Sequence, residues 1–226
     1  MTTRVGSPSQ RSILITTGAA RLQGTLAVPA EPSGLVLFAH GSGSSRLSPR
    51  NTTVAQQLRA TGLGTLLFDL LTEAEAGNRT NVFDIDLLAR RLLAATYWLN
   101  RQPEAAGLRL GYFGASTGAA AALKAAAASP VEIGAVVSRG GRPDLAGDAL
   151  PRVRAPTLLL VGSRDPVVLD LNQKAAARLT CFARLVVIPG ASHLFEEPGT
   201  LEEAGRLAAA WFVQHLAHQP TVGSRS

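Results

Sequence analysis

The sequence predicts an α/β fold in which parallel strands are linked by helices and covered by them on both faces. Short apolar runs bounded by Gly or Pro alternate along the chain with longer stretches of helical period, which is typical of this class. The later apolar runs also lack any alternation with polar residues, as expected of strands with both faces buried. The eight candidate strands are 13–16, 24–28, 34–39, 64–69, 108–113, 133–138, 157–161 and 184–188.

The first two predicted helices lie between the early strands. The helix predicted over 51–61 ends at Gly62, a residue suited to the left-handed position after a helix. The pattern over 84–100 predicts an amphipathic surface helix with a single apolar stripe. The residues of that stripe are Leu88, Leu92, Ala95 and Leu99.

Two further helices follow the candidate strands of the second half. The Ala-rich stretch 117–128 predicts a helix packed closely on the sheet, and Pro130 ends it because proline disfavours helical geometry in the residue before it. The last helix is predicted over 201–216, and we expect the tail from His218 to be frayed. Its expected buried residues are Ala204, Ala208, Trp211 and Phe212.

The chain of 226 residues contains no internal repeat and no linker rich in Pro, Gly or Ser. We therefore predict one domain over 1–226, with a core of about 12–216 and loose ends. The connection 70–82 is long for a loop, and it can serve either as a flap or as a solvated acidic loop.

Composition excludes several classes of function. The net charge is +6, but no basic run is interleaved with aromatic residues, so we expect no nucleic-acid partner. The start of the chain is polar, and no stretch offers the roughly 20 apolar residues of a membrane span, so we expect a cytoplasmic protein without membrane contact. A single cysteine, Cys181, excludes an intramolecular disulfide and leaves no paired-cysteine metal site. The oligomeric state stays open.

The strongest chemical signal is the pentapeptide Gly-Ala-Ser-Thr-Gly at 114–118. It follows an apolar strand and opens the Ala-rich helix, which is the strand, turn, helix context in which Gly-x-Ser-x-Gly presents a nucleophile. Gly114 and Gly118 remove Cβ atoms where strand and helix nearly touch, and the serine backbone is expected to be strained. A serine-rich loop is the alternative, but the context favours Ser116 as a nucleophile.

A serine hydroxyl needs a base to take its proton, and the chain offers four histidines. His215 and His218 lie at the end of the last helix, where capping or solvation explains them, and His40 closes an apolar run. His193 follows the last strand, where an open parallel sheet places its ligand crevice. We therefore predict His193 as the base, with an ordinary surface loop histidine as the alternative.

The base in turn needs a carboxylate to orient it. Asp165 follows the strand 157–161 and lies between Ser116 and His193 in the chain, in the order Ser, Asp, His. Other acidic residues are weaker candidates because of their place in the chain. They are Asp69, Asp144, Asp148, Asp170, Glu196 and Glu197.

Acyl transfer also needs donors for the oxyanion. The amide of Thr117 supplies the first, and the second is expected from the glycine-rich turn after His40, where we choose the Ser42 amide with Gly41 as the alternative. This turn lacks the Lys of a phosphate-binding loop, so we do not interpret it as one.

These residues together resemble the α/β-hydrolase superfamily, and most of all its dienelactone-hydrolase-related branch. The resemblance extends over about 22–216 and depends on the His40-Gly41 turn, Ser116 preceded by Tyr112-Phe113, Asp165 and the Ser192-His193 loop. It implies a mostly parallel sheet of about eight strands flanked by helices, and hydrolysis of esters through an acyl-enzyme without a cofactor or metal.

The sequence departs from that branch at two points. Dienelactone hydrolases use a cysteine where Ser116 stands, and they carry a glutamate beside the oxyanion loop where 37–40 reads Leu-Phe-Ala-His. The resemblance therefore implies the reaction class without implying dienelactone as the substrate. Only 139–156 separates the sixth and seventh strands, so no large cap domain is expected and the site is open and suited to small acyl groups.

Two arginines follow the sixth strand and are candidates for substrate binding. Arg139 and Arg142 could hold an anionic substrate, because Arg binds carboxylates through two parallel hydrogen bonds. A solvated side chain or a loop-stabilising salt bridge is the favoured explanation, because most exposed arginines need no ligand, and Arg46, Arg50 and Arg79 have the same ambiguity.

The sequence thus predicts a serine hydrolase for small carboxylic esters or lactones. Ser116 attacks the carbonyl, His193 moves the proton, Asp165 orients His193, and the amides of Ser42 and Thr117 hold the oxyanion. Two alternatives remain. One is a catalytically idle scaffold that binds a small ligand or a protein, and the other is an acyltransferase or peptidase with the same triad.

Overall fold

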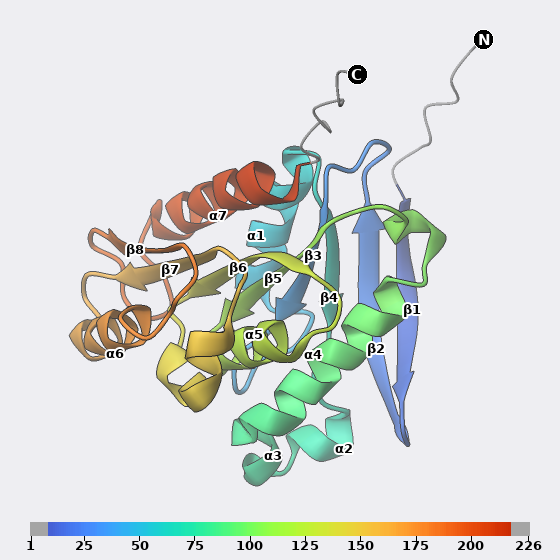
Figure 1. Cartoon of the computed structure of the whole chain (residues 1–226), viewed down its shortest axis with the longest axis horizontal. Helices are drawn as coiled ribbons and strands as arrows, with labels where there is room; N and C mark the ends of the chain where they lie inside the picture. Colours follow the sequence, from blue (N-terminus) through green and yellow to red (C-terminus); the bar gives the residue numbers. More distant parts are fainter. Residues whose placement is uncertain (1–8, 218–226) are drawn as a thin grey trace, which may run out of the picture.

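The computed structural model describes residues 9–217, which form one eight-stranded sheet with helices on both faces (Figure 1). The strands lie in the order β1-β2-β4-β3-β5-β6-β7-β8. Their bounds are β1 Ser9–Thr17, β2 Ala20–Val28, β3 Leu35–Ala39, β4 Gly64–Phe68, β5 Leu110–Ala115, β6 Ile133–Arg139, β7 Thr157–Gly162 and β8 Ala183–Ile188. All eight predicted strands are therefore present, and the predicted α/β fold with a mostly parallel sheet is confirmed.

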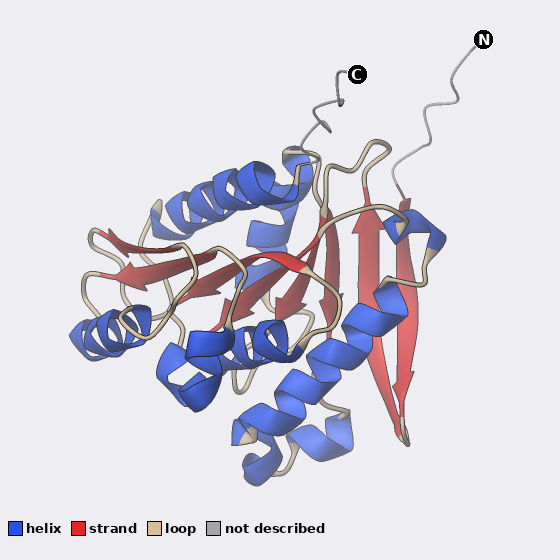
Figure 2. Cartoon of the chain, in the orientation of Figure 1, coloured by secondary structure: helices blue, strands red, loops and turns tan. Residues whose placement is uncertain are grey.

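The helices fill the connections between these strands (Figure 2). They are α1 Pro49–Ala60, α2 Glu73–Ala76, α3 Arg79–Phe83, α4 Ile85–Leu99, α5 Thr117–Ala128, α6 Pro166–Ala176 and α7 Thr200–Leu216, with 3₁₀ segments at Pro103–Ala105 and Pro143–Arg152. The four helices expected from the sequence agree with α1, α4, α5 and α7 to within two residues at each end.

The strand directions place the carboxyl ends of most strands at one edge of the sheet. β1 pairs antiparallel with β2, and β2 antiparallel with β4, whereas β4, β3, β5, β6, β7 and β8 run parallel. β3 lies between β4 and β5. After β3 the chain forms the neighbouring strand β4 on one side of β3, and it later returns to form β5 on the other side. In open parallel sheets a ligand crevice forms at this switch point, outside the carboxyl ends of the strands.

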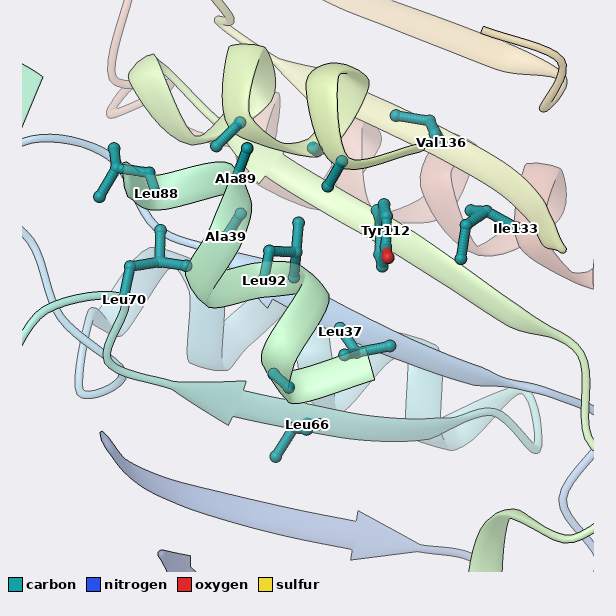
Figure 3. Close-up of a cluster of buried hydrophobic side chains, with 14 of the residues drawn as sticks. Leu37, Ala39, Leu66, Leu70, Leu88, Ala89, Leu92, Tyr112, Ile133 and Val136 are labelled. Carbon is teal, nitrogen blue, oxygen red and sulfur yellow. The ribbon is translucent and has the colours of Figure 1, made fainter. Parts of the chain in front are cut away.

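Two apolar clusters cover the two faces of the sheet. On one face α1 and α7 pack against strand residues such as Val36, Phe113 and Leu158. On the other face α4 and α5 cover Leu37, Leu66 and Tyr112 (Figure 3). Every residue of β3, β4, β5, β6 and β7 is buried, as the unbroken apolar runs predicted.

The expected apolar faces of α4 and α7 are confirmed. Leu88, Leu92, Ala95 and Leu99 of α4 are buried, and so are Ala204, Ala208, Trp211 and Phe212 of α7. The small side chains of α5 allow the close approach to the sheet that the Ala-rich composition predicted, because six of its alanine and leucine residues are buried and none is larger than leucine. They are Ala119, Ala120, Ala121, Ala122, Leu123 and Ala125, preceded by Gly118 in the same turn.

Several expectations need correction. β8 lies at the edge of the sheet formed by residues 9–217 and has only Ile188 buried, so the expectation that the late strands are covered on both faces fails there. The connection 70–82 is not an irregular loop, since it contains α2 and α3. The residues around Asp144, for which no helix was predicted, form the 3₁₀ segment Pro143–Arg152. β1 and β2 are longer than predicted because they form a two-stranded antiparallel hairpin with the alternating burial that a short apolar window misses.

The expected loose ends, including His218, lie outside the described residues. Among the helices of 9–217, none combines the length and the apolar character needed to cross a membrane.

Candidate active site

Ser116 forms the turn between β5 and α5 and has a strained backbone. Its φ of 50° and ψ of −122° lie in a region that residues other than glycine rarely occupy. Three hydrogen bonds hold it there: its N–H donates to the Arg139 carbonyl (3.3 Å), and its carbonyl accepts from Ala119 (3.1 Å) and Arg142 (3.1 Å). The expected sharp reversal at Ser116 is therefore present at the carboxyl edge of the sheet.

The two glycines of the pentapeptide permit close backbone approach, as the sequence predicted. A Cβ at Gly114 would overlap Ala119 at the start of α5. A Cβ at Gly118 would overlap the carbonyl oxygens of Ala39 and His40, so the first turn of α5 presses directly on the end of β3. Any larger residue would push the nucleophile turn away from the oxyanion turn.

Asp165 and His193 are hydrogen-bonded to each other. His193 Nδ1 lies 2.7 Å from Asp165 Oδ2, and an ionised carboxylate can only accept, so Nδ1 carries a proton and donates it to Asp165. The Asp165 side chain is 15% exposed and that of His193 is 39% exposed. Asp165 also precedes α6 and caps it by accepting from the Val168 N–H at 3.5 Å, which fixes the carboxylate further.

The loop that carries His193 is fastened to the turn that carries Asp165. The Arg164 N–H donates to the Ala191 carbonyl (2.9 Å), and the Gly190 N–H donates to Ser163 Oγ (2.8 Å). A Cβ at Gly162 would overlap Ala191, so the two turns are in direct contact. The histidine and its partner are thus held as one unit.

Two residues that the sequence analysis did not select as functional support the histidine loop. Glu197 accepts from the Ser192 N–H (2.9 Å) and from the Ser192 hydroxyl (3.2 Å), just before His193. Phe195 is buried and has a φ of 57°, a second strained residue beside the site. The sequence places the acidic Glu197 four residues after His193, where its carboxylate can accept hydrogen bonds within the loop. Nothing in the sequence indicates that Phe195 has a positive φ.

Ser116 and His193 line one cavity of about 240 Å³. Its wall comes from the turn after β3, the start of α1, the ends of β5 and β6, and the loop after β8. The lining residues are Gly41, Ser42, Ser44, Ser48, Arg50, Asn51, Ala115, Ser116, Arg139, Gly140, His193 and Leu194. The structure therefore brings the predicted nucleophile, the predicted base and the predicted oxyanion turn around a single space.

The oxyanion turn departs from the simple expectation. The Ser42 N–H donates to Thr117 Oγ1 at 2.9 Å, so the amide predicted to hold an oxyanion already has a hydroxyl partner. Thr117 is the first residue of α5, where a backbone N–H has no acceptor within the helix. The sequence analysis assigned Thr117 a role through its amide alone and did not foresee that its side chain ties the two turns together.

His40 helps to hold the same turn in place through hydrogen bonds of both its ring nitrogens. The Leu70 N–H donates to its Nε2 (3.0 Å), so the proton lies on Nδ1, which faces the Gly41 carbonyl (3.0 Å). Burial lowers the pKa of His40, although the Gly41 carbonyl and the nearby Asp69 oppose that shift. His40 is therefore a neutral structural histidine that joins β3 to the segment after β4.

The two predicted substrate-binding arginines lie in different environments. Arg139 is the last residue of β6, is 6% exposed and lines the cavity of Ser116. Arg142 binds Asp144 through two parallel hydrogen bonds of 2.9 Å and 2.8 Å, which raises the pKa of Arg142, and it is not among the residues that line this cavity. For Arg142 the structure supplies the loop-stabilising salt bridge that the sequence left as an alternative.

The remaining acidic and histidine candidates are engaged elsewhere. Asp69 accepts from the backbone and side chain of Arg46, and Glu196 lies 3.4 Å from Arg50. His215 is not simply solvated as expected, because its ring packs on Trp211 with ring centres 4.5 Å apart. The described residues 9–217 contain no group of three or more His, Cys, Asp or Glu side chains arranged to hold a metal ion.

A larger cavity of about 690 Å³ adjoins the same turn on its other side. It shares Gly41, Ser42 and Ser44 with the cavity of Ser116, and its far wall is formed by the segment that contains α2 and α3. The residues of that wall are Leu71, Thr72, Glu73, Ala76 and Val82. The segment first considered as a flap thus borders a space next to the site, and its closure stays a prediction.

Comparison with known proteins gives one family and several relatives. The sequence model of the dienelactone hydrolase family matches residues 35–217. The crystal structure of dienelactone hydrolase from Anabaena variabilis is 53% identical and superposes with a TM-score of 0.89, covering 93% of this chain and 100% of that one. An esterase from Pyrococcus furiosus shares the fold at 19% identity with a TM-score of 0.76, covering 93% of this chain and 94% of the esterase.

Another relative has a name that is neither a dienelactone hydrolase nor an esterase. A Mycobacterium tuberculosis protein provisionally named a phosphoribosyl transferase is 60% identical over 204 residues, which are 90% of this chain. The matched region is only 46% of that protein, so the chain spans less than half the length of this relative.

Proposed function

Because this chain belongs to the dienelactone hydrolase family, we propose that it is a serine hydrolase that cleaves small carboxylic esters or lactones through an acyl-enzyme. The hydrogen bond between Asp165 and His193, beside the cavity that Ser116 also lines, is the observation that carries this proposal. It leaves His193 Nε2 as the free basic atom in a cavity that also holds a strained serine.

The proposed reaction begins with attack of Ser116 Oγ on the substrate carbonyl while His193 Nε2 takes the hydroxyl proton. The Asp165 carboxylate stabilises the imidazolium that forms. His193 then returns the proton to the leaving alcohol, and the acyl group remains on Ser116. A water molecule, deprotonated by His193 in the same way, releases the acid and restores the serine.

The oxyanion is proposed to be held by two backbone amides, those of Thr117 and Ser42. Because the Ser42 N–H points to Thr117 Oγ1 before substrate arrives, the bound oxyanion must share or replace that acceptor. A hydroxyl can donate as well as accept, so Thr117 Oγ1 can turn its own proton toward the oxyanion while it stays beside Ser42.

The name of the Mycobacterium tuberculosis relative does not displace this proposal. This chain matches less than half of that protein, whereas the dienelactone hydrolase model matches residues 35–217 of this chain. We therefore attach no phosphoribosyl transfer to the residues described above.

The decisive experiment compares the parent with Ser116→Ala and with Ser12→Ala, a matched control that removes an exposed serine hydroxyl from β1. With 4-nitrophenyl acetate and butyrate, we expect Ser116→Ala to lose at least about a thousandfold in kcat and Ser12→Ala to match the parent. A fluorophosphonate probe should label the parent and Ser12→Ala, but leave Ser116→Ala unlabelled.

The other outcomes separate the alternative functions. A folded parent that neither labels nor turns over any ester would support an idle scaffold that binds a ligand. Product analysis with added alcohols or peptides would reveal an acyltransferase or a peptidase. Hydrolysis by Ser116→Ala at the parent's rate would contradict the proposed mechanism.

A further inference from the structure

Asn172 is a fully buried amide in the middle of α6. It is 0% exposed and lies on the buried face of the helix with Val168 and Ala175. Asparagine is a poor helix former, and burying its amide costs free energy that an apolar side chain at the same place would not cost. The sequence therefore breaks a local rule at this position, as proteins commonly do where function requires it.

The Asn172 side chain joins α6 to residues 139–142, which we call the bridging segment. Its Nδ2 donates to the Val168 carbonyl in its own helix (2.8 Å) and to the Gly141 carbonyl (2.9 Å). A carbonyl can only accept, so the NH₂ group must face both partners and the orientation of the amide is fixed. Its Oδ1 is buried without a hydrogen-bond partner among the described residues, so stability alone does not explain this amide.

The bridging segment in turn holds the nucleophile. The Arg139 carbonyl accepts from the Ser116 N–H (3.3 Å), and the Arg142 N–H donates to the Ser116 carbonyl (3.1 Å). Gly141, whose carbonyl Asn172 binds, lies between these two residues in the chain. The strained backbone of Ser116, with its φ of 50°, is therefore fixed by a segment that Asn172 fastens.

The bridging segment and α6 also adjoin the proposed base and acid. A Cβ at Gly140 would lie 2.9 Å from the His193 carbonyl oxygen, so the bridging segment is in contact with the histidine loop. α6 begins directly after Asp165, which is its N-terminal cap. The amide of Asn172 thus connects the segment that fixes Ser116 with the helix that Asp165 caps.

We propose that Asn172 is a positioning residue of the hydrolase site. Its amide holds the Gly141 carbonyl, and through the bridging segment it keeps the strained serine turn at the productive distance from the His193 ring. Asn172 does not line the cavity of Ser116, so it acts through main-chain atoms alone. Its loss should slow the chemical step, because a small displacement of a nucleophile lowers the rate without weakening binding to the same extent. This inference rests on the proposed hydrolase function.

The test compares the parent with Asn172→Leu, which keeps the branched shape but cannot donate, and with Thr96→Val as a matched control. Thr96 is also a buried helix residue with two bonds, since its hydroxyl donates to the Leu92 carbonyl (2.9 Å) and pairs with the Tyr112 hydroxyl (2.6 Å). It belongs to α4 and does not line the cavity of Ser116. Both substitutions should lower the midpoint of urea unfolding, because each leaves a buried polar partner unpaired.

The decisive measurement is the labelling of Ser116 by a fluorophosphonate probe, well below the melting temperature of each protein. The maximal labelling rate reports the chemical step, and the probe concentration that gives half of that rate reports binding. We expect Asn172→Leu to lose about tenfold in the maximal rate and to keep the half-saturating concentration within about twofold. Thr96→Val should match the parent in both. The kcat for 4-nitrophenyl acetate should fall in parallel with the labelling rate.

A merely structural asparagine would lower stability and leave the labelling rate of the folded protein unchanged. If Asn172→Leu does not fold, Asn172→Ser replaces it, because its hydroxyl can still bond the Val168 carbonyl but is too short to reach Gly141. The same loss in maximal rate is expected from that variant.

Three results would overturn the positioning role and leave the hydrolase proposal intact. They are parent-like labelling by a folded Asn172 variant, a change in the half-saturating concentration alone, and an equal loss of rate in Thr96→Val. A folded parent that neither labels nor hydrolyses any ester would reject both the hydrolase and the positioning role.

Discussion

Thr117 contributes to the site through two different groups. Its backbone N–H has no acceptor within the helix because Thr117 is the first residue of α5, and its hydroxyl accepts from the N–H of Ser42 at 2.9 Å. The hydroxyl therefore holds the glycine-rich oxyanion turn against the nucleophile turn. The residue type at this position matters as much as its amide.

We expect Thr117→Val to lower kcat/KM for a 4-nitrophenyl ester by about tenfold, because it leaves the Ser42 amide without a partner and frees the turn. Thr117→Ser keeps the hydroxyl and should stay within about twofold of the parent. Steady-state kinetics on the three proteins measures the difference. Equal activity of Thr117→Val and the parent would show that the hydroxyl positions nothing.

His40 makes the free energy of unfolding depend on pH. Burial lowers its pKa below the ordinary value of 6.5, so the unfolded chain binds a proton at a higher pH than the folded chain does. The folded state loses stability as the pH falls below about 6.5, at a rate of at most about 1.4 kcal/mol per pH unit from this group. Above that pH both states hold His40 neutral and its contribution is constant.

Urea unfolding at pH 7.5, 6.5 and 5.5 measures this dependence. His40→Gln retains an acceptor for the Leu70 N–H but cannot titrate, so its stability should fall less steeply over the same interval. The burial of His215 lowers its pKa too, and that contribution remains in the variant. Parallel pH profiles for the parent and His40→Gln would contradict this account.

Single residues differ in how far the sequence predicts them. Ser116, Asp165 and His193 could be selected because each follows a recognisable apolar strand, and parallel strands bring such positions to one edge. The burial of Arg139 and the salt bridge of Arg142 could not be told apart, because both arginines lie at or just after the end of the same strand and only side-chain packing separates them.

Among the elements, α5 shows how closely a helix can approach the sheet. Gly118 allows its first turn to touch the end of β3, where a Cβ would overlap two carbonyl oxygens. Backbone atoms cannot yield as a flexible side chain can. The position of Ser116 therefore depends on the absence of a Cβ atom at Gly118.

Gly118→Ala should lower the free energy of unfolding by about 3 kcal/mol or more, at the upper end of overpacking effects. Gly77→Ala is the matched control, because Gly77 has a φ of −68° and its nearest neighbour would lie 3.6 Å from the new Cβ. We expect that variant to remain within about 0.5 kcal/mol of the parent in urea unfolding. Equal stability of the two variants would exclude the close contact.

Elements were predictable where burial alone decides them. The five fully buried strands and the helix over 117–128 agree with the sequence because their residues are mostly apolar or mostly small. α2 and α3 were missed because each is at most five residues long, and side-chain contacts hold this segment in place. The Glu75 N–H, for example, donates to Thr72 Oγ1 at the start of α2, and the Glu75 carboxylate pairs with Arg91 of α4 at 2.5 Å.

In the whole molecule, the two apolar clusters share one sheet. Residues of β3 alternate between them, with Leu37 on one side and Val36 and Phe38 on the other. Neither cluster can lose its packing without disturbing strands that the other also uses. The single domain over 1–226 stays a prediction, and thermal unfolding can test it.

We therefore expect one cooperative unfolding transition in differential scanning calorimetry, with a calorimetric enthalpy close to the van't Hoff enthalpy. Far-ultraviolet circular dichroism and tryptophan fluorescence should report the same midpoint, because Trp98 lies on α4 and Trp211 on α7, on opposite faces of the sheet. Two separated transitions would indicate independently folding parts.

The place of His193 after β8, the last strand, has a consequence for synthesis. The nucleophile turn leaves the ribosome well before the histidine loop, and that loop is held only when β8 has paired with β7. A nascent chain thus carries Ser116 for a further 77 residues of translation before His193, its proposed base, is made. The proposed triad is therefore complete only after β8 has joined the sheet.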